Sequence, residues 1–362
     1  MTTYQQHQQP RVLINGFGRM GRLFLRAVYD QHLTGGPTTH PFTVVHVNEV
    51  KGTAVTAAHL LMYDSVKGIW RGHTSDPTTP TPDGNAPGGF IVDGQTIGFS
   101  NSATIDAIPW SSLGGPIDLV VECTGKFLTK DVLDRYFAHG VKKVVVSAPC
   151  KFEGALNVVV GVNDHLYDRD VHSIVTAASC TTNCLAPVIK VIRDKYTIVH
   201  ASFTTIHCVT NTQTIVDTAH ADLRRARACM TSLVPTTTGS ASAISLIFPD
   251  LHGKISGTAV RVPLLNASIT DVVLELRDDV TAAEINDAMR EAANGELKGV
   301  LAVEEKPLVG EDFRGHTASS IVDALSTTVT DRRMVKILAW YDNEQGYCWR
   351  MAELAAKVAA SI

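Results

Sequence analysis

Short apolar runs alternate with amphipathic stretches through the first 180 residues of the chain. The run at 11–14 predicts a buried strand, and apolar residues at helical spacing over 22–29 predict a helix. Further apolar and β-branched runs predict more strands, at 42–49, 117–122 and 144–146. Alternation of this kind is typical of an open, mostly parallel sheet covered by helices. The first part of the chain is therefore predicted to be an α/β domain.

The pattern changes after about residue 180. A helix is predicted over 180–196, and an acidic helical stretch over 282–293. Long β-rich runs lie between them, at 198–208, 257–262 and 268–276. Long strands mixed with helices indicate an α+β second domain. Helical spacing in the last segment, 349–360, predicts a helix that packs back onto the core.

Three polar stretches interrupt these elements. The breaker cluster at 35–41 predicts a loop, and the Pro-, Gly- and Thr-rich stretch at 73–89 predicts a long surface loop or a hairpin. Residues 1–10 are Gln-rich and lack a charged segment followed by an apolar one. No secretory signal is therefore expected there.

Composition limits the classes of function. The 362 residues suggest two domains, and 44% hydrophobic residues suffice for a large core. The net charge of −4 argues against a nucleic-acid binder, which needs excess Lys and Arg. No run approaches about 18 apolar residues, so no membrane partner is expected. Seven cysteines in so long a chain do not form a disulfide framework, and they favour a reducing, cytoplasmic location.

A glycine motif, G-x-G-x-x-G, joins the first predicted strand to the first helix. Its glycines, Gly16, Gly18 and Gly21, allow a tight turn, close approach of a pyrophosphate and close helix–strand packing. The strand–turn–helix context favours a dinucleotide site. Glu49 ends the next strand, where an acid would accept from a ribose hydroxyl and repel a 2′-phosphate. An acid at this position favours NAD over NADP. The alternative to a dinucleotide site is a plain glycine-rich turn followed by a solvated glutamate.

A cysteine lies where an apolar strand gives way to a helix, in the sequence A-S-C-T-T-N-C at 178–184. The positive end of the helix dipole would stabilise a Cys180 thiolate, and a nearby histidine would complete an activated pair. Two alternatives remain from the residues alone: a buried thiol, or a metal pair with Cys184. No metal is expected, because no further Cys/His pair with ligand spacing lies nearby.

Three further segments are each compatible with more than one role. His207 ends a β-rich run, but it is one of 14 histidines and the sequence alone does not select it. Residues 220–227 hold three arginines in four positions, which suit a phosphate, a solvated face or an interface. Residues 235–240, P-T-T-T-G-S, offer hydroxyl and backbone donors to an oxyanion, or form a plain Thr-rich loop.

Taken together and in order, these motifs resemble phosphorylating glyceraldehyde-3-phosphate dehydrogenases. The resemblance covers nearly the whole chain, through the segments 12–19, 178–184, 222–227, 235–239, 260–263 and 340–344. It implies a fold class of α/β, with a Rossmann-type parallel-sheet NAD-binding domain over 1–178 and an α+β catalytic domain over 179–344. A C-terminal helix at 345–362 would pack back onto the NAD-binding domain.

The resemblance also implies roles for single residues. Cys180 would be the nucleophile and His207 its base. NAD would contact Gly16, Gly18, Arg19, Met20, Gly21, Glu49, Ser147 and Asn343. The substrate phosphate would contact Thr210, Arg225 and Arg261, and inorganic phosphate would contact Ser179, Thr181, Thr238 and Gly239. A homotetramer is implied, with a mobile loop over roughly 210–232 at an interface beside the cofactor.

Departures from the family pattern keep other functions open. Glu49 stands where the family usually has Asp, and Gln345 where it usually has an aromatic residue. Glu at the ribose position also suits erythrose-4-phosphate dehydrogenase, although the P-T-T-T-G segment favours a phosphate-accepting site. Residues 51–66 resemble an arsenate-resistance branch, in which arsenate replaces phosphate and the product is 1-arseno-3-phosphoglycerate. A non-catalytic NAD-binding protein is disfavoured by retention of Cys180 and His207.

Overall fold

The computed structural model describes residues 9–33, 41–78 and 88–362. Within these ranges the chain forms two compact units. The first contains the chain up to residue 157, residues 167–177 and residues 351–362. The second contains residues 158–166 and 178–350. The C-terminal helix α7 (Gln345–Ala359) therefore begins in the second unit and ends in the first.

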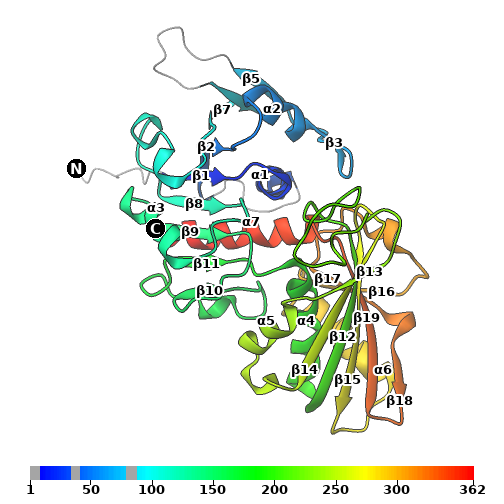
Figure 1. Ribbon diagram of the computed structural model, residues 1–362. Coiled ribbons are helices and arrows are strands. Elements are labelled where there is room, and N and C mark those ends of the chain that lie inside the picture. Colours follow the sequence, from blue (N-terminus) through cyan, green and yellow to red (C-terminus); the bar gives the residue numbers. More distant parts are fainter. Residues whose placement is uncertain (1–8, 34–40, 79–87) are drawn as a thin grey trace. The chain divides into compact units, whose positions relative to one another are not determined.

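A nine-stranded sheet forms the centre of the first unit, in the order β10-β11-β9-β8-β1-β2-β7-β6-β5 (Figure 1). The parallel strands are β1 (Arg11–Asn15), β2 (Thr43–Asn48), β7 (Gln95–Ser100), β8 (Leu119–Glu122), β9 (Lys143–Val146), β10 (Ala155–Asn157) and β11 (Ile174–Thr176). An antiparallel edge is added by β5 (Ser75–Thr78) and β6 (Gly89–Val92). The helices of this unit are α1 (Arg19–Leu33), α2 (Ala54–Met62) and α3 (Lys130–Ala138), and a short hairpin joins β3 (Tyr63–Asp64) to β4 (Gly68–Ile69).

Burial explains why the central strands are apolar along their whole length. Val12, Leu13 and Ile14 on β1 are fully buried, and so are the three apolar residues of β8. A parallel sheet covered by helices on both faces leaves no exposed side for polar residues. Because the strands are parallel, the carboxyl ends of β1, β2 and β8 lie at one edge of the sheet. This is the edge at which such sheets bind nucleotides.

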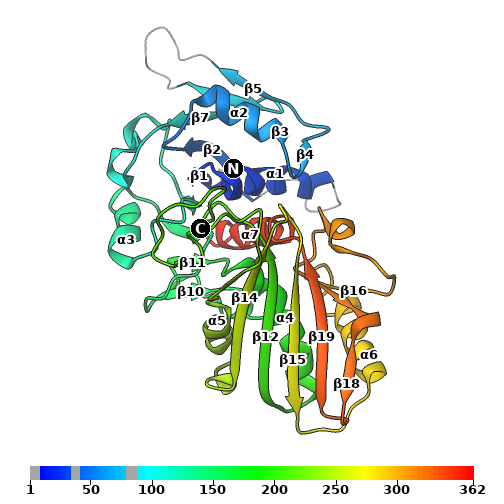
Figure 2. The same ribbon diagram turned by 45° about the vertical axis from the view of Figure 1, so that its right-hand side comes forward.

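The second unit is built on a sheet in the order β13-β14-β12-β15-β19-β17-β16, with β18 paired to β19. Its strands are β12 (Ile198–Cys208), β13 (Val234–Thr236), β14 (Ile255–Val262), β15 (Ser268–Leu276), β16 (Leu301–Glu304), β17 (Ser320–Asp323), β18 (Thr328–Thr330) and β19 (Met334–Tyr341). Figure 2 shows one face of this sheet covered by α4 (Cys180–Lys195), α5 (Ser240–Ile247) and α6 (Ala282–Asn294). Parallel and antiparallel pairs both occur, so this is a mixed sheet, which is compatible with the expected α+β architecture.

The periodicity predictions for these elements are confirmed. The expected helices at 22–29, 180–196 and 282–293 correspond to α1, α4 and α6, and the expected strands correspond to members of the two sheets. The fold class is thus α/β, with a parallel Rossmann-type sheet and a second, mixed-sheet unit. The helices α2, α3 and α5 were not predicted from the pattern.

The structure tests the predictions for the three polar stretches only in part. The hairpin alternative for 73–89 is confirmed at its ends, where β5 and β6 pair in antiparallel fashion. Residues 79–87 between them, most of the loop expected at 35–41 and most of the segment 1–10 lie outside the described residues. Across the described ranges, no helix has the length and apolar character needed to cross a membrane.

Candidate active site

The chain turns sharply just before Cys180. Ala178 adopts a left-handed conformation with φ of +51°, which is unfavourable for a non-glycine residue by about 1 kcal/mol. Ser179 follows as the N-cap of α4, and its Oγ accepts a hydrogen bond of 3.2 Å from the Thr182 amide. Cys180 is therefore the first residue of a helix whose body is almost completely buried. The thiol lies at the positive end of the helix dipole, as the sequence predicted.

Cys180 and His207 meet although 27 positions separate them. The Sγ of Cys180 lies 3.5 Å from Nε2 of His207, which is the penultimate residue of β12. The other ring nitrogen, Nδ1, lies 2.7 Å from the carbonyl oxygen of Cys208. With its hydrogen on Nδ1, the ring donates to this carbonyl and the Nε2 lone pair faces the thiol, which is the orientation that a general base requires. With its hydrogen on Nε2, the ring faces the thiol as a donor and Nδ1 becomes an acceptor.

Parallel pairing of β12 with β14 brings a third residue to the pair. His207 and Arg261 are direct partners across the two strands. Nη1 of Arg261 lies 2.7 Å from Nδ1 of His207 and donates a hydrogen bond of 2.9 Å to the Cys208 carbonyl. The guanidinium is thus a permanent positive charge beside the Cys–His pair.

Burial controls the protonation of the pair. It lowers the pKa of His207 to about 3, with a further contribution from Arg261. Burial also raises the pKa of the Cys180 thiol, and the Arg261 guanidinium is the leading influence in the opposite direction. His207 is consequently neutral in the resting pair, and the positive charge beside the thiol is that of Arg261.

The expected phosphate-binding residues fall into three places in the second unit. The Thr181 hydroxyl is buried and bonds to the Tyr341 hydroxyl at 2.9 Å, next to the N-cap Ser179. Thr238 and Gly239 immediately precede α5, with Gly239 as its N-cap, and Thr238 Oγ1 accepts from the Ser240 amide. Apart from Arg261 on β14, the remaining two lie on the segment that follows β12: Thr210 bonds to Thr212, and Arg225 donates to the Thr236 hydroxyl at 2.8 Å.

Tyr341 is a residue of this site that sequence reasoning missed. Its hydroxyl joins Thr181 on α4 to Thr205 on β12, at 2.9 and 2.8 Å. Its ring stands edge-on to His207, with the ring centres 5.9 Å apart. Only its place in the W-Y-D-N-E segment marked it in the sequence. Tyr341 fixes the start of α4 relative to the strand that carries the histidine.

The glycine motif of the first unit has the geometry of a dinucleotide-binding turn. Gly16 has φ of +89°, and a Cβ there would lie 2.6 Å from the backbone nitrogen of Thr124. A Cβ on Gly21 would lie 2.2 Å from the Gly16 carbonyl oxygen, so α1 packs directly on the turn. A Cβ on Gly18, in contrast, would have no described heavy atom within 4 Å. Open space over Gly18 fits the close approach of a pyrophosphate.

Glu49 is fixed next to this turn. Its two carboxylate oxygens accept hydrogen bonds of 2.8 and 3.1 Å from the backbone amides of Phe17 and Lys51. The carboxylate therefore lies between the glycine turn and the end of β2, where the ribose acid of such a site belongs. The residues present fit a dinucleotide.

Two family matches cover most of the chain. Residues 10–130 match the NAD-binding domain of glyceraldehyde 3-phosphate dehydrogenase, and residues 179–343 match its C-terminal domain. Glyceraldehyde-3-phosphate dehydrogenase 3 of Nostoc sp. is 54% identical over 97% of this chain and 99% of its own length. The enzymes of Geobacillus stearothermophilus and Bacillus subtilis (number 1) are 45% and 44% identical, over 97% and 96% of this chain and 98% of their own lengths.

This chain belongs to the glyceraldehyde-3-phosphate dehydrogenase family. The resemblance drawn from the motifs is thereby confirmed, as is the expectation of an NAD-dependent oxidoreductase. The cofactor-binding residues named for the family divide between the two units. All but Asn343 lie in the first unit.

Two of these cofactor residues have side-chain partners within the protein. The Arg19 guanidinium pairs with Asp64 through bonds of 2.8 and 3.2 Å, which use two of its five N–H donors. Asn343 Oδ1 lies 3.1 Å from the Sγ of Cys208, a thiol whose pKa burial raises to about 12. Cys208 therefore remains a thiol that donates to the amide.

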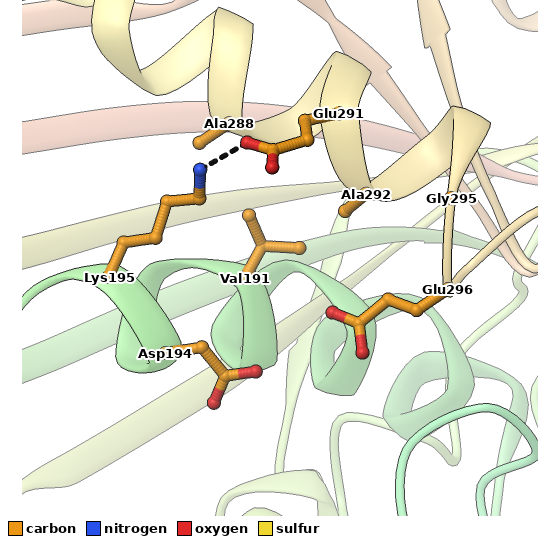
Figure 3. Close-up of a pocket in the computed structure, with 8 residues that line it drawn as sticks. All are labelled: Val191, Asp194, Lys195, Ala288, Glu291, Ala292, Gly295 and Glu296. Atoms are coloured by element: carbon orange, nitrogen blue, oxygen red, sulfur yellow. Dashed lines mark hydrogen bonds and ion pairs between the residues drawn. The ribbon is translucent and has the colours of Figure 1, made fainter.

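Two hollows in the second unit differ in their relation to this site. One, of about 230 Å³, lies between α4 and α6 and is lined by Val191, Ala288, Ala292 and charged residues such as Lys195 and Glu291 (Figure 3). It contains none of the site residues. The other, of about 430 Å³, is lined by Arg224, Thr258 and the three threonines at 236–238, and so adjoins the expected phosphate segment.

The glycine motif yields a paired prediction. Gly18→Ala should leave the melting temperature within about 2 °C of wild type but weaken NAD binding at least tenfold, because its Cβ occupies only the space for the pyrophosphate. Gly21→Ala should lower the melting temperature by several degrees, because its Cβ collides with the Gly16 backbone. Thermal unfolding and NAD titration of both variants check this. Equal losses of stability in the two variants would contradict the separate roles.

Proposed function

We propose that this chain catalyses the phosphorylating, NAD-dependent oxidation of glyceraldehyde 3-phosphate, with the first unit as its cofactor domain and the second as its catalytic domain. The observation that carries the proposal is the contact of 3.5 Å between the thiol of Cys180, at a helix start, and Nε2 of His207. A thiol beside a neutral base is equipped for covalent attack on an aldehyde. The product is 1,3-bisphosphoglycerate, which makes the reaction a step of glycolysis.

The residues of this chain divide the chemistry between them. Cys180 Sγ attacks the aldehyde carbon, and the thiol proton passes through His207 to give a thiohemiacetal. Bound NAD supplies the acceptor for the hydride that leaves this carbon. His207 Nε2 takes the hydroxyl proton at the same time, so that a thioester remains on Cys180. Such general-base assistance is worth about 10²–10⁴-fold in rate.

Two anion sites complete the proposal. Arg261, Arg225 and Thr210 hold the phosphate of the substrate, a role supported by the guanidinium of Arg261 beside the Cys–His pair. Ser179, Thr181, Thr238 and Gly239 hold the attacking phosphate. This second site is supported by the hydroxyl and amide donors at the starts of α4 and α5.

The acceptor oxyanion is phosphate or arsenate. The two have nearly the same charge and shape, and the segment 51–66 supports an arsenate-using role in arsenate resistance. We expect turnover with both oxyanions and a preference for glyceraldehyde 3-phosphate over erythrose 4-phosphate. Steady-state rates with each aldehyde and each oxyanion test this. A higher kcat/KM with the erythrose substrate would overturn the proposal.

We further propose that the enzyme is a cytoplasmic homotetramer. The proposal is supported by the segment 210–232, which exposes large apolar side chains. Ile215, Val216 and Leu223 are 78%, 75% and 81% exposed. Light scattering on the purified protein should give four times the chain mass, and a monomer would contradict the assembly.

The proposed ribose contact leads to a prediction about cofactor choice. Glu49→Ala should weaken NAD binding and narrow the preference over NADP at least tenfold, because it removes both a ribose acceptor and a charge that repels a 2′-phosphate. Glu153→Ala, which removes an exposed acid of the same unit, is the matched control. The ratio of kcat/KM values for NAD and NADP measures the effect. An unchanged ratio in Glu49→Ala would mean that another group selects the cofactor.

A further inference from the structure

A chain of hydrogen bonds crosses the sheet of the first unit at the carboxyl ends of four neighbouring strands. Ser100 Oγ on β7 donates to Asn48 Oδ1 on β2 at 2.8 Å. Asn48 Nδ2 donates to Asn15 Oδ1 on β1 at 2.7 Å, and Asn15 Nδ2 donates to Glu122 Oε2 on β8 at 2.8 Å. The side chains of Asn15, Asn48 and Glu122 are buried. All three bonds run in one direction and end on the carboxylate.

Glu122 is built into the fold as an acceptor. It is fully buried, and it receives two bonds at each oxygen. Asn15 Nδ2 and the Tyr136 hydroxyl donate to Oε2, while the amide and the hydroxyl of Thr124 donate to Oε1. Burial raises the pKa of Glu122, and these four donors oppose that effect. Only a group that accepts at both oxygens satisfies all four donors.

The same chain of bonds reaches three parts of the cofactor cradle. Asn15 immediately precedes Gly16, and Asn48 immediately precedes Glu49. Thr124, which Glu122 holds by two bonds, provides the backbone on which Gly16 packs, 2.6 Å from the position of a Gly16 Cβ. The glycine turn, the ribose acid and the turn after β8 are therefore connected through one buried carboxylate.

We propose that Glu122 is a positioning residue for the dinucleotide. It holds the end of β1 and the turn at 123–124 at the separation that keeps Gly16 and Gly18 in their binding conformation. The inference rests on the proposed NAD-dependent function. It deepens that function by assigning cofactor affinity to a residue beneath the cradle, at the end of β8.

Glu122→Gln tests the proposal, because a glutamine amide presents donors to one of the two donor pairs and so releases it. We expect the dissociation constant of NAD to rise at least about tenfold. At saturating NAD, kcat and the KM for glyceraldehyde 3-phosphate should stay within threefold of wild type. Tyr136→Phe is the matched control: it removes a donor to Oε2 and an acceptor for Asn15 Nδ2, but it leaves both bonds between Glu122 and the Thr124 turn in place. It should lower the melting temperature but leave NAD affinity within threefold of wild type.

The outcomes separate the alternatives. Suppose that Glu122→Gln and Tyr136→Phe both lose stability. If NAD affinity is then unchanged in both variants, or reduced equally in both, Glu122 has only a structural role and the inference fails. If Glu122→Gln does not fold, Thr124→Val decides: it removes one hydroxyl donor without changing the shape, and unchanged NAD affinity in it overturns the inference. Calorimetric NAD titration of the wild-type protein keeps the two proposals apart. Absence of binding there would refute the proposed function itself.

Discussion

Replacing Cys180 with serine is expected to abolish oxidation of glyceraldehyde 3-phosphate, with a fall in kcat of at least about 10⁴-fold. The serine hydroxyl is a far weaker nucleophile than the thiol, and its ester would lack the reactivity of a thioester. NAD binding should be unaffected, because Cys180 is none of the residues expected to contact NAD. Stopped-flow measurement of NADH formation, together with calorimetric titration of NAD, checks both parts.

A second cysteine on the same helix provides the control. Cys184 is fully buried one turn further along α4, and its Sγ lies near the Ser320 hydroxyl and the Ala339 carbonyl. A serine at this position could keep these partners, so Cys184→Ser should retain turnover within about threefold of wild type and lose only stability. Near-normal turnover in Cys180→Ser would refute the covalent mechanism. Loss of turnover in Cys184→Ser but not in Cys180→Ser would mean that Cys184, and not Cys180, is the nucleophile.

Replacing His207 with asparagine should slow the oxidation step by about 10²–10⁴-fold. Asparagine keeps a hydrogen-bonding group of similar size but cannot take the hydroxyl proton. Rapid-mixing measurements of the first turnover isolate this step from product release. A rate near that of wild type would mean that another of the 14 histidines is the base.

The same variant should change the pH at which Cys180 reacts. His207 Nε2 is the nearby acceptor for the thiol proton, and burial already raises the pKa of the Cys180 thiol. Without the imidazole, burial is opposed mainly by Arg261, so alkylation by iodoacetamide should require a higher pH than in wild type. The rate of alkylation against pH measures this. If only the oxidation slows and the alkylation profile stays in place, His207 acts as a base without assisting thiolate formation.

The sequence was most informative where local pattern determines structure. Apolar runs located the buried strands. Residues such as Val12 and Val120 are fully buried, because both faces of the parallel sheet are covered. The glycine motif and the position of Cys180 at a helix start were also visible, because both depend on neighbouring residues only. Helix α5 was missed because its sequence, S-A-S-A-I-S-L-I, resembles a loop exit as much as a helix.

Contacts between distant residues could not be predicted from pattern. His207 lies beside Arg261 only because β12 and β14 pair in parallel, 54 positions apart. The role of Glu122 was hidden for a similar reason: it ends an apolar run like a solvated strand terminus, yet its donors come from β1, the following turn and α3. Charge and burial at such positions depend on the fold, and so does the protonation of His207.

The most direct test of the central claim is a single-turnover experiment without phosphate or arsenate. Wild-type enzyme mixed with NAD and glyceraldehyde 3-phosphate should release one NADH per active site in a burst and then stop, with a 3-phosphoglyceryl thioester on the Cys180 peptide in the mass spectrum. Adding phosphate should restore turnover and remove the adduct. Continuous turnover without an acceptor oxyanion, or an acyl group on any residue other than Cys180, would contradict the account.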